Sequence, residues 1–155
     1  MSTLTEQRPP VAAAGIDPRG PRFTAAVTAV VLALVLVASP PVGTVLIGLQ
    51  AVLFGIGAVL GVQHTPTAWV FRTFVRPRLS APTELEDPQP PRFAQAVGLA
   101  FAVVAFAGFA SGATLVGLVA TGLALVAALL NALLGFCLGC EIYLLLKRAT
   151  TPARP

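Results

Sequence analysis

Apolar residues fall in four long runs, and short polar or turn-forming segments separate each run from the next. The runs are Phe23–Ser39, Val42–Val62, Phe93–Ala110 and Ala113–Leu134. A helix needs about 20 predominantly apolar residues to cross the hydrocarbon core of a bilayer, and none of these runs has the polar side of a surface helix. The pattern predicts an all-α membrane protein whose four transmembrane helices contact the lipid bilayer.

A short polar motif precedes the first and the third run. Asp17–Phe23 reads DPRGPRF, and Asp87–Phe93, which begins 70 residues later, reads DPQPPRF. Asp is favoured at a helix N-cap and Pro in the first turn, so each motif predicts a helix start. Two spans follow each motif, which predicts two hairpins over residues 16–62 and 87–147. Because each half has an even number of spans, we expect a parallel repeat about an axis near the membrane normal.

The segments outside the two hairpins differ in character. Within residues 63–86, the aromatic and basic stretch Pro66–Val75 predicts a short helix in the headgroup region. A proline-rich cytoplasmic linker follows it. Residues 1–15 and 148–155 are expected to be disordered tails, because their composition offers little apolar surface to bury.

Charge is scarce and strongly segregated. Charged residues make up 10% of the chain and hydrophobic residues 56%, and the formal net charge is +4. All 10 Lys and Arg residues lie before the first run, between the second and third, or after the fourth. Four spans bring these segments to one side, and basic loops stay in the cytoplasm. We therefore expect a multi-pass plasma-membrane protein with both termini cytoplasmic. Nucleic acid is not an expected partner, because the basic residues flank apolar spans and form no stripe with aromatics.

The residues with reactive side chains gather after the fourth run. Cys137 and Cys140 are the only two cysteines and form a C-x-x-C. If the helix continues through them, the i, i+3 spacing places both sulfurs on one face, which Glu141 joins. Glu141 is the only acid inside an apolar stretch, where ionisable groups are costly and usually functional. These three residues are the catalytic candidates, and the neighbouring Tyr143 is a binding candidate.

Three interpretations of the cysteine pair stay open on the residues alone. A redox-active dithiol attacks with one thiolate and resolves with the other, and we expect Cys140 as the exposed attacker and Cys137 as the resolver. A soft metal is a weaker alternative, with Cys137, Cys140 and His64 as ligands and Glu141 as a fourth, at a spacing that matches zinc sites poorly. The third interpretation makes both cysteines small packing residues. A structural disulfide is not expected on the reducing side of the membrane.

Two arginines suggest a different function. Arg22 and Arg92 occupy the same place in the two motifs, and the simplest expectation puts both at the membrane interface. Alternatively, both bind an anion at the cytoplasmic mouth of a small transporter or channel subunit, which four spans would form only as a homo-oligomer. A scaffold that docks a cytoplasmic enzyme is a further alternative. No cofactor is expected, and no nucleophile elbow, phosphate loop or zinc-protease motif indicates a stand-alone enzyme.

Two glycines lie beside the cysteines. Gly135 and Gly139 form a small-xxx-small pair of the kind that packs helices together in lipid. The fourth run and the segment that follows it are too long for one upright span. A tilt, a kink at these glycines or a bend into the interface is therefore expected.

The D-P-x-x-P-R-F motif, the four spans and the string G-F-C-x-G-C-E-x-Y at Gly135–Tyr143 resemble a domain-of-unknown-function family of small actinobacterial integral membrane proteins. The likeness covers about residues 15–147. The architecture is more loosely similar to four-helix membrane proteins of the DoxX, DoxD and MauE kind, which serve thiol and sulfur redox chemistry. Genes of the family often stand beside genes for thioredoxin-like proteins and sulfurtransferases. The resemblance therefore implies that Cys137 and Cys140 act with such a partner.

Overall fold

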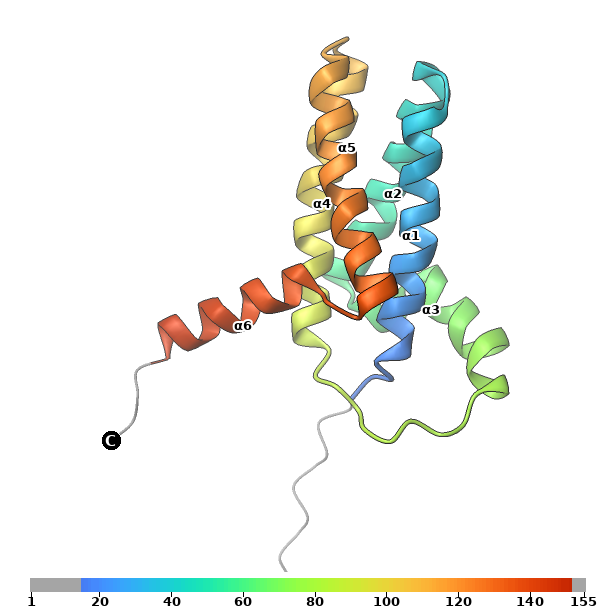
Figure 1. Ribbon diagram of the computed structural model, residues 1–155, viewed down its shortest axis with the longest axis vertical. Coiled ribbons are helices and arrows are strands. Elements are labelled where there is room, and N and C mark those ends of the chain that lie inside the picture. Colours follow the sequence, from blue (N-terminus) through green and yellow to red (C-terminus); the bar gives the residue numbers. More distant parts are fainter. Residues whose placement is uncertain (1–14, 152–155) are drawn as a thin grey trace, which may run out of the picture.

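The computed structural model of the protein describes residues 15–151, and four helices in this range are long and apolar enough to cross a membrane. They are α1 (Arg19–Val37), α2 (Pro40–Val59), α4 (Gln89–Ala110) and α5 (Thr114–Leu129), which a π-helical turn prolongs over Leu130–Leu134. The four helices stand side by side as an upright bundle (Figure 1). The prediction of an all-α protein with four apolar spans is confirmed, and the bundle is consistent with a lipid bilayer environment.

The first helix of each predicted hairpin begins inside the Asp-Pro motif. The Asp17 carboxylate accepts a hydrogen bond from the Arg19 N–H at 3.0 Å, and the Asp87 carboxylate accepts one from the Gln89 N–H at 2.9 Å. These bonds satisfy an amide at each helix start, where the first N–H groups have no partner within the helix. The prediction that both motifs start helices is confirmed, although each Asp stands one residue before the N-cap.

The residues that immediately precede the two motifs pair with each other below the bundle. Ile16 and Glu86 exchange two backbone hydrogen bonds of 2.9 Å as an isolated antiparallel bridge. The Arg19 guanidinium donates to the Asp17 carboxylate at 2.9 Å and to the Ser80 carbonyl at 2.9 Å. The linker that returns to α4 is therefore tied to the start of α1, as its course beneath the helices shows (Figure 1).

Small and branched side chains fill the centre of the bundle. The buried cluster consists of Leu32, Val35, Ile47, Phe54, Ala102, Ala105, Ala120 and Ala124. Its alanines lie on α4 and α5, where small side chains allow the close helix approach that stabilises packing in lipid. Many larger apolar side chains point outward instead: Val30 is 61% exposed and Leu115 is 75% exposed. The bundle therefore has an apolar surface on its outside as well as in its core.

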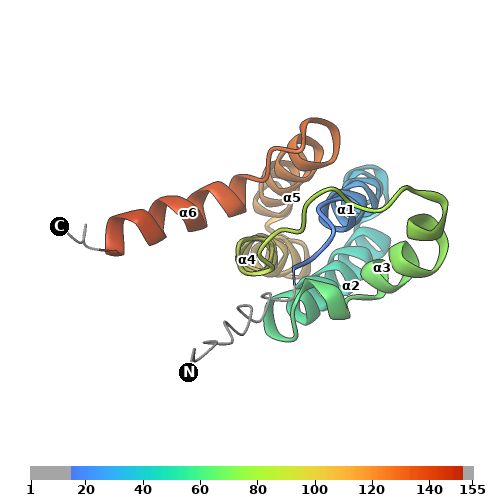
Figure 2. The same cartoon turned by 90° about the horizontal axis from the view of Figure 1, so that it is seen from below.

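Two further helices leave the bundle at one end. One is α3 (Pro66–Val70), prolonged by a π-helical turn over Phe71–Val75 and a 3₁₀ turn over Arg76–Arg78, and the other is α6 (Leu138–Thr150). They extend from the bundle in opposite directions (Figures 1 and 2). The predicted helix over 66–75 is present. α6 continues past the predicted start of the C-terminal tail, and the predicted tail residues 1–14 and 152–155 lie outside the described range.

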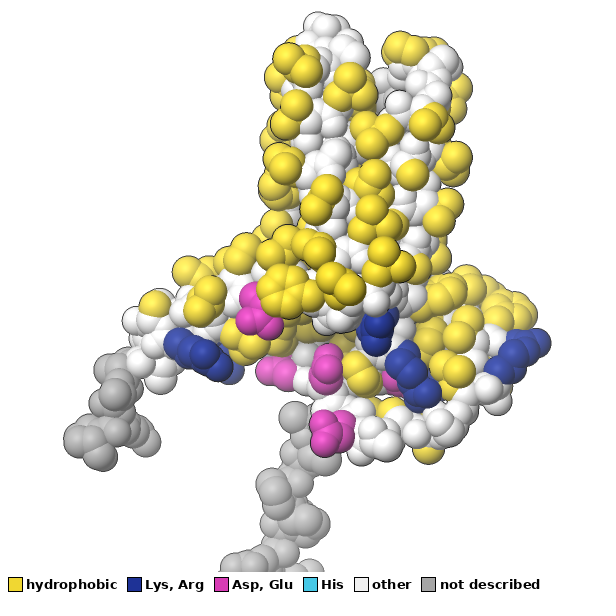
Figure 3. Space-filling model, viewed as in Figure 1, with side chains coloured by type: hydrophobic (Ala, Val, Ile, Leu, Met, Phe, Trp, Pro, Cys, Tyr) yellow, Lys and Arg dark blue, Asp and Glu magenta, His cyan; other side chains and the backbone are white. Residues whose placement is uncertain are grey.

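Charged side chains gather at the end from which α3 and α6 extend. Figure 3 shows Lys, Arg, Asp and Glu side chains around this base, whereas hydrophobic side chains cover the shaft of the bundle above it. The described basic residues all belong to the starts of α1 and α4, to the segment that contains α3, or to α6. The bundle therefore has one charged end and one end that carries no charged residue.

Candidate functional site

The chain changes direction sharply just before the first cysteine. Gly135 has a φ of 69°, in the left-handed region that glycine adopts without steric cost. Its N–H donates to the Asn131 carbonyl at 3.0 Å, and the Phe136 N–H donates to the Leu130 carbonyl at 3.2 Å. Such a left-handed glycine with backward amide bonds is a common helix terminator. The fourth span therefore ends at Leu134, and the bend anticipated among the alternatives is the one found.

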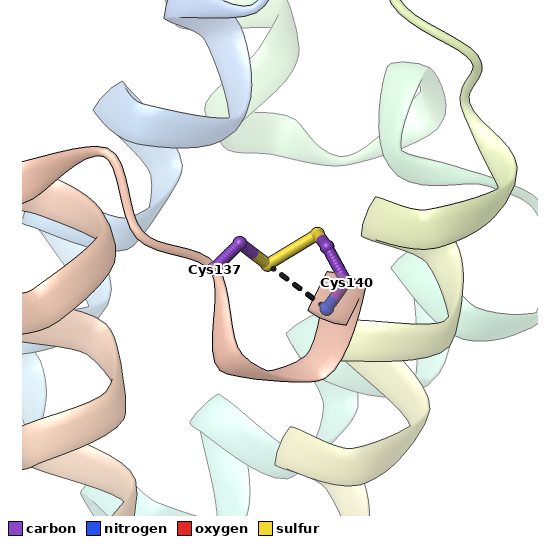
Figure 4. Close-up of a disulfide and its surroundings, with 2 residues drawn as sticks. All are labelled: Cys137 and Cys140. Carbon is purple, nitrogen blue, oxygen red and sulfur yellow. Dashed lines mark hydrogen bonds between the residues drawn. A yellow bond between two sulfur atoms is a disulfide. The ribbon is translucent and has the colours of Figure 1, made fainter. Parts of the chain in front are cut away.

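Cys137 lies at the N-cap of α6, outside the helix. Its Sγ accepts a hydrogen bond from the Cys140 N–H at 3.4 Å (Figure 4). The fourth helix does not continue through the cysteines, so the condition under which both would share one face of it is not met. The sulfurs come together through the cap geometry, because the first turn of α6 folds the Cys140 backbone back towards Cys137.

The two sulfurs are joined in a disulfide (Figure 4). The Cα atoms of Cys137 and Cys140 are 5.2 Å apart, well inside the range that a disulfide requires. Both side chains are partly exposed. This pairing differs from the expectation that no structural disulfide would form, and it shows that the local backbone accommodates the oxidised form of the C-x-x-C.

Gly139 holds the start of α6 against α4. It is buried, and a Cβ added there would lie 2.6 Å from both Cα and Cβ of Ala94. Real Cβ atoms do not approach backbone atoms so closely, so only glycine permits this contact. Of the glycine pair, Gly139 has the predicted packing role, whereas Gly135 ends a helix. The contact places the disulfide between the end of the fourth span and the first turns of α4.

The other two candidate residues on α6, Glu141 and Tyr143, lie in different environments. Glu141 is exposed in the first turn, where its negative charge is favourable at the positive end of the helix dipole. Tyr143 is half-buried, and its ring lies 5.8 Å from the Phe93 ring. The Lys147 ammonium is 6.0 Å from the Tyr143 ring centroid. Tyr143 therefore packs α6 against the Asp-Pro motif of α4, while Glu141 remains open to solvent beside Cys140.

Arg92 and Arg22 lie near the ends of two different helices. The Arg92 guanidinium donates to the carbonyls of Ala58 and Val59 at 2.8 Å each, at the C-terminal end of α2. The Arg22 guanidinium carbon is 3.4 Å from the position that a Cβ on Gly135 would take. A cation is favourable at a helix C-terminus, where carbonyls lack partners. Arg92 therefore lies at the C-terminal end of α2. Arg22 lies at the end of the fourth span, beside the segment that leads to Cys137.

His64 is engaged locally. Its Nδ1 lies 2.8 Å from the Leu60 carbonyl oxygen, at the end of α2. Within residues 15–151, no three side chains of the His, Cys, Asp and Glu types are placed to hold a metal ion together. The structure thus does not bring His64 to the pair formed by Cys137 and Cys140.

An ion pair anchors the motif at the start of α1. The Arg19 guanidinium, hydrogen-bonded to Asp17, holds the pKa of that carboxyl below its ordinary value. Partial burial acts in the opposite direction, and the Arg19 N–H together with the charge of Arg76 reinforces the lowering. The Asp17 side chain is only 7% exposed, so the carboxylate depends on these donors.

Thr65 was not identified as a capping residue from the sequence alone. Thr65 caps α3, and its hydroxyl accepts a hydrogen bond from the Ala68 N–H at 3.2 Å. Its neighbour in the chain is a proline, and Thr-Pro at a turn is a recognisable helix-start signal. Thr65 stands 72 residues before Cys137, which has the same capping position on α6. This correspondence is visible in the sequence when the residues that follow the two hairpins are compared. It is not visible when only the two Asp-Pro motifs are compared.

A comparison with models of protein families shows which family the chain belongs to. Residues 16–148 match the family model described as domain of unknown function, DUF4395. The chain belongs to the DUF4395 family. The prediction of membership in a domain-of-unknown-function family is confirmed, and the match takes in all four spans and most of α6. A search of curated proteins and a search of solved structures each found no significant match to this DUF4395 chain.

Proposed function

We propose that this DUF4395 protein exchanges disulfides through Cys137 and Cys140 with a thiol protein on the cytoplasmic side, of the thioredoxin-like or sulfurtransferase class. The observation that supports this most directly is the position of Cys137 at the N-cap of α6, within disulfide distance of Cys140. Helix N-termini stabilise thiolates, and the thiolate is the form that attacks a disulfide. Both cysteine residues are partly exposed, and they belong to the charged end of the bundle from which α6 extends.

This geometry favours Cys137 as the attacking residue, the reverse of the assignment suggested by the sequence. Its sulfur accepts the Cys140 N–H, one of the first amides of α6, which have no partner within the helix. Cys140, inside the first turn, donates that N–H and is placed to resolve. Exposure does not separate the two residues, because both are partly exposed.

The exchange transfers two electrons from the cysteine pair to the partner, and the Cys140 proton balances the one that the partner takes up. The Cys137 thiolate attacks one sulfur of the partner's disulfide, an S–S bond breaks, and the partner's released thiolate takes up a proton. Cys140 then loses its proton and attacks the Cys137 sulfur, which forms the internal disulfide and releases the partner's second thiolate. The pair is oxidised and the partner reduced, and the reverse sequence oxidises a partner dithiol. We assign the exposed carboxylate of Glu141 to proton transfer with Cys140.

The charged end of the bundle faces the cytoplasm in this proposal. The described Lys and Arg residues lie at the end that carries α3 and α6, and basic segments remain cytoplasmic in plasma-membrane proteins. Both termini then lie in the cytoplasm, and the thiol site meets cytoplasmic partners. A reporter that is active only in the cytoplasm tests this orientation. It should be active when fused to residue 155 and inactive when placed in the loop at Ser111–Ala113.

We further propose that the two halves are a parallel repeat. The supporting observations are the two Asp-capped helix starts and a second correspondence after the hairpins. Phe23 lies 5.8 Å from Phe71, and Phe93 lies 5.8 Å from Tyr143, between ring centroids. Each half then consists of a hairpin and a capped helix that packs an aromatic ring against its own Asp-Pro motif.

Trapping the mixed disulfide in intact cells tests the thiol function. With Cys140→Ser, the attacking Cys137 has no resolver, so a disulfide-linked adduct with a thiol protein should accumulate after a brief oxidant pulse. With Cys137→Ser, the matched control, little adduct should form. Mass-tagged alkylation of the wild type should show the pair cycling between dithiol and disulfide. A pair that stays unreactive in the wild type, with no adduct in either variant, would refute the proposed exchange.

A further inference from the structure

The helical segment after α2 is fixed at its root and exposed at its tip. We name residues 66–78 the α3 arm. The Thr24 hydroxyl donates to the Thr67 hydroxyl at 3.0 Å, and Phe71 is buried against Phe23 of α1. Farther out, Trp69 is 56% exposed and meets Phe74 edge-to-face, with ring centroids 5.9 Å apart. The arm therefore has a rigid position from which it presents two aromatic side chains outward.

A cavity of about 370 Å³ lies between the arm and the linker. Arg72, Arg76 and Ser80 provide its polar side chains, and Pro77, Leu79, Ala81 and Pro82 complete the lining. The linker side of this cavity is preformed, because the Arg19 guanidinium holds the Ser80 carbonyl at 2.9 Å. The cavity is large enough for a phosphate diester and its first substituent atoms.

The arginines of the arm differ in what they contact. Arg78 donates to the Phe74 carbonyl within the arm. The side chains of Arg72 and Arg76, by contrast, form no hydrogen bond or ion pair with any described residue, and both residues are exposed beside the cavity. The charge of Arg76 acts on Asp17, but that carboxylate is already bound by Arg19. Two guanidinium groups thus border one cavity with their donors available.

We propose that this cavity binds the phosphate headgroup of an anionic phospholipid. Guanidinium groups bind phosphate oxygens in a planar, bidentate geometry. Trp69 and Phe74 lie on the same arm and are of the type that anchors to the interface, so they would contact the acyl chains of the same lipid. Two arginines disfavour a zwitterionic headgroup such as choline, whose ammonium would be repelled.

The position of the arm supports a lipid as the source of the phosphate. Figure 3 shows hydrophobic side chains above the base on the arm's side, continuous with the shaft of the bundle, and Lys or Arg side chains below them. The arm extends sideways at the level where the apolar spans end (Figures 1 and 2). A side chain at this level faces headgroups, and basic residues there attract anionic lipids.

Lipid-dependent thermal stability of the purified full-length protein tests the site. Short-chain phosphatidylglycerol added to the detergent-solubilised protein should raise Tm, whereas phosphatidylcholine and inorganic phosphate at the same concentration should not. Arg72→Gln and Arg76→Gln should each weaken the apparent phosphatidylglycerol affinity by about fivefold. Arg72→Lys should restore part of the affinity, which separates loss of charge from loss of fold.

Arg148→Gln is the matched control, since it removes the same charge from α6 at the same end of the bundle. Its phosphatidylglycerol affinity should stay within twofold of the wild type. An equal loss in Arg148→Gln, or equal stabilisation by phosphatidylcholine, would overturn the proposal. If inorganic phosphate stabilised the wild type but not Arg72→Gln, the ligand of the cavity would be a soluble anion and not a lipid. The phosphatidylglycerol affinity of Cys137→Ser should equal that of the wild type. The test of the lipid site is therefore independent of the test of the thiol function.

Discussion

Thr65 and Cys137 occupy the same position at the start of two helices that leave opposite sides of the bundle. The Thr65 hydroxyl accepts the Ala68 N–H at 3.2 Å, and the Cys137 sulfur accepts the Cys140 N–H at 3.4 Å. Six residues after each cap, an aromatic ring packs on the phenylalanine of an Asp-Pro motif. A hydroxyl cap after the first pair of spans thus corresponds to a cysteine cap after the second pair.

This correspondence predicts a variant that keeps the fold and loses the chemistry. Cys137→Thr should retain the cap of α6, because threonine already performs this role at position 65. Its Tm under reducing conditions should match that of the reduced wild type, while partner adducts should vanish. Thermal unfolding by circular dichroism, run beside the trapping assay, measures both properties.

Alanine at the same positions provides the comparison. Cys137→Ala and Thr65→Ala should each cost about 1 kcal/mol, because an amide at the helix start loses its acceptor. A Cys137→Thr protein that unfolds as readily as Cys137→Ala would show that the sulfur does not act as a cap.

Gly139→Ala should loosen the start of α6 from α4. The new Cβ would lie 2.6 Å from the backbone Cα of Ala94, so α6 must shift. Overpacking of this kind costs about 1–3 kcal/mol, and we expect faster alkylation of both reduced cysteines. Gly122→Ala is the matched control on α5, since nothing lies within 4 Å of its added Cβ. If both variants were equally stable and equally reactive, the close contact would be unimportant.

Arg92→Gln should destabilise the end of α2. The variant loses two hydrogen bonds of 2.8 Å to the carbonyls of Ala58 and Val59. We expect a loss of about 1 kcal/mol, because these charge-assisted bonds are exposed to solvent. Hydrogen exchange of the amides near the end of α2 should accelerate. Arg22→Gln, which removes the matching arginine, should leave exchange in α2 unchanged, and any acceleration there would contradict local capping by Arg92.

The ion pair of Asp17 should make stability depend on pH. The Arg19 hydrogen bond lowers the pKa of Asp17 in the folded protein, so the carboxylate contributes stability at pH values above its unfolded pKa. That contribution should disappear as the pH falls below about 4 through the lowered folded pKa. Asp17→Asn should therefore have a lower Tm than the wild type at pH 7, and the difference should shrink on acidification. A difference independent of pH would show that the charge is not responsible.

Much of the fold is determined by local sequence. The four spans follow from runs of apolar residues long enough to cross a bilayer, and the helix starts follow from Asp and Pro at fixed positions. The helix over 66–75 follows from its proline start and its aromatic and basic residues. These features depend on chain-local properties, namely hydropathy, helix propensity and capping, and need no knowledge of distant contacts.

The arrangement of the thiol site depends on tertiary structure. The sequence identified Cys137 and Cys140 and allowed either a continuous helix, with both on one face, or a bend. Gly135 and Gly139 look alike as a small-xxx-small pair, yet one ends a helix with positive φ and the other packs on Ala94. Which glycine has which role depends on where α4 lies, and that position is set by its packing against α2, α5 and α6. The sequence alone thus identified Cys137 and Cys140 as the candidate thiol pair, whereas the tertiary structure decided that Cys137 caps α6.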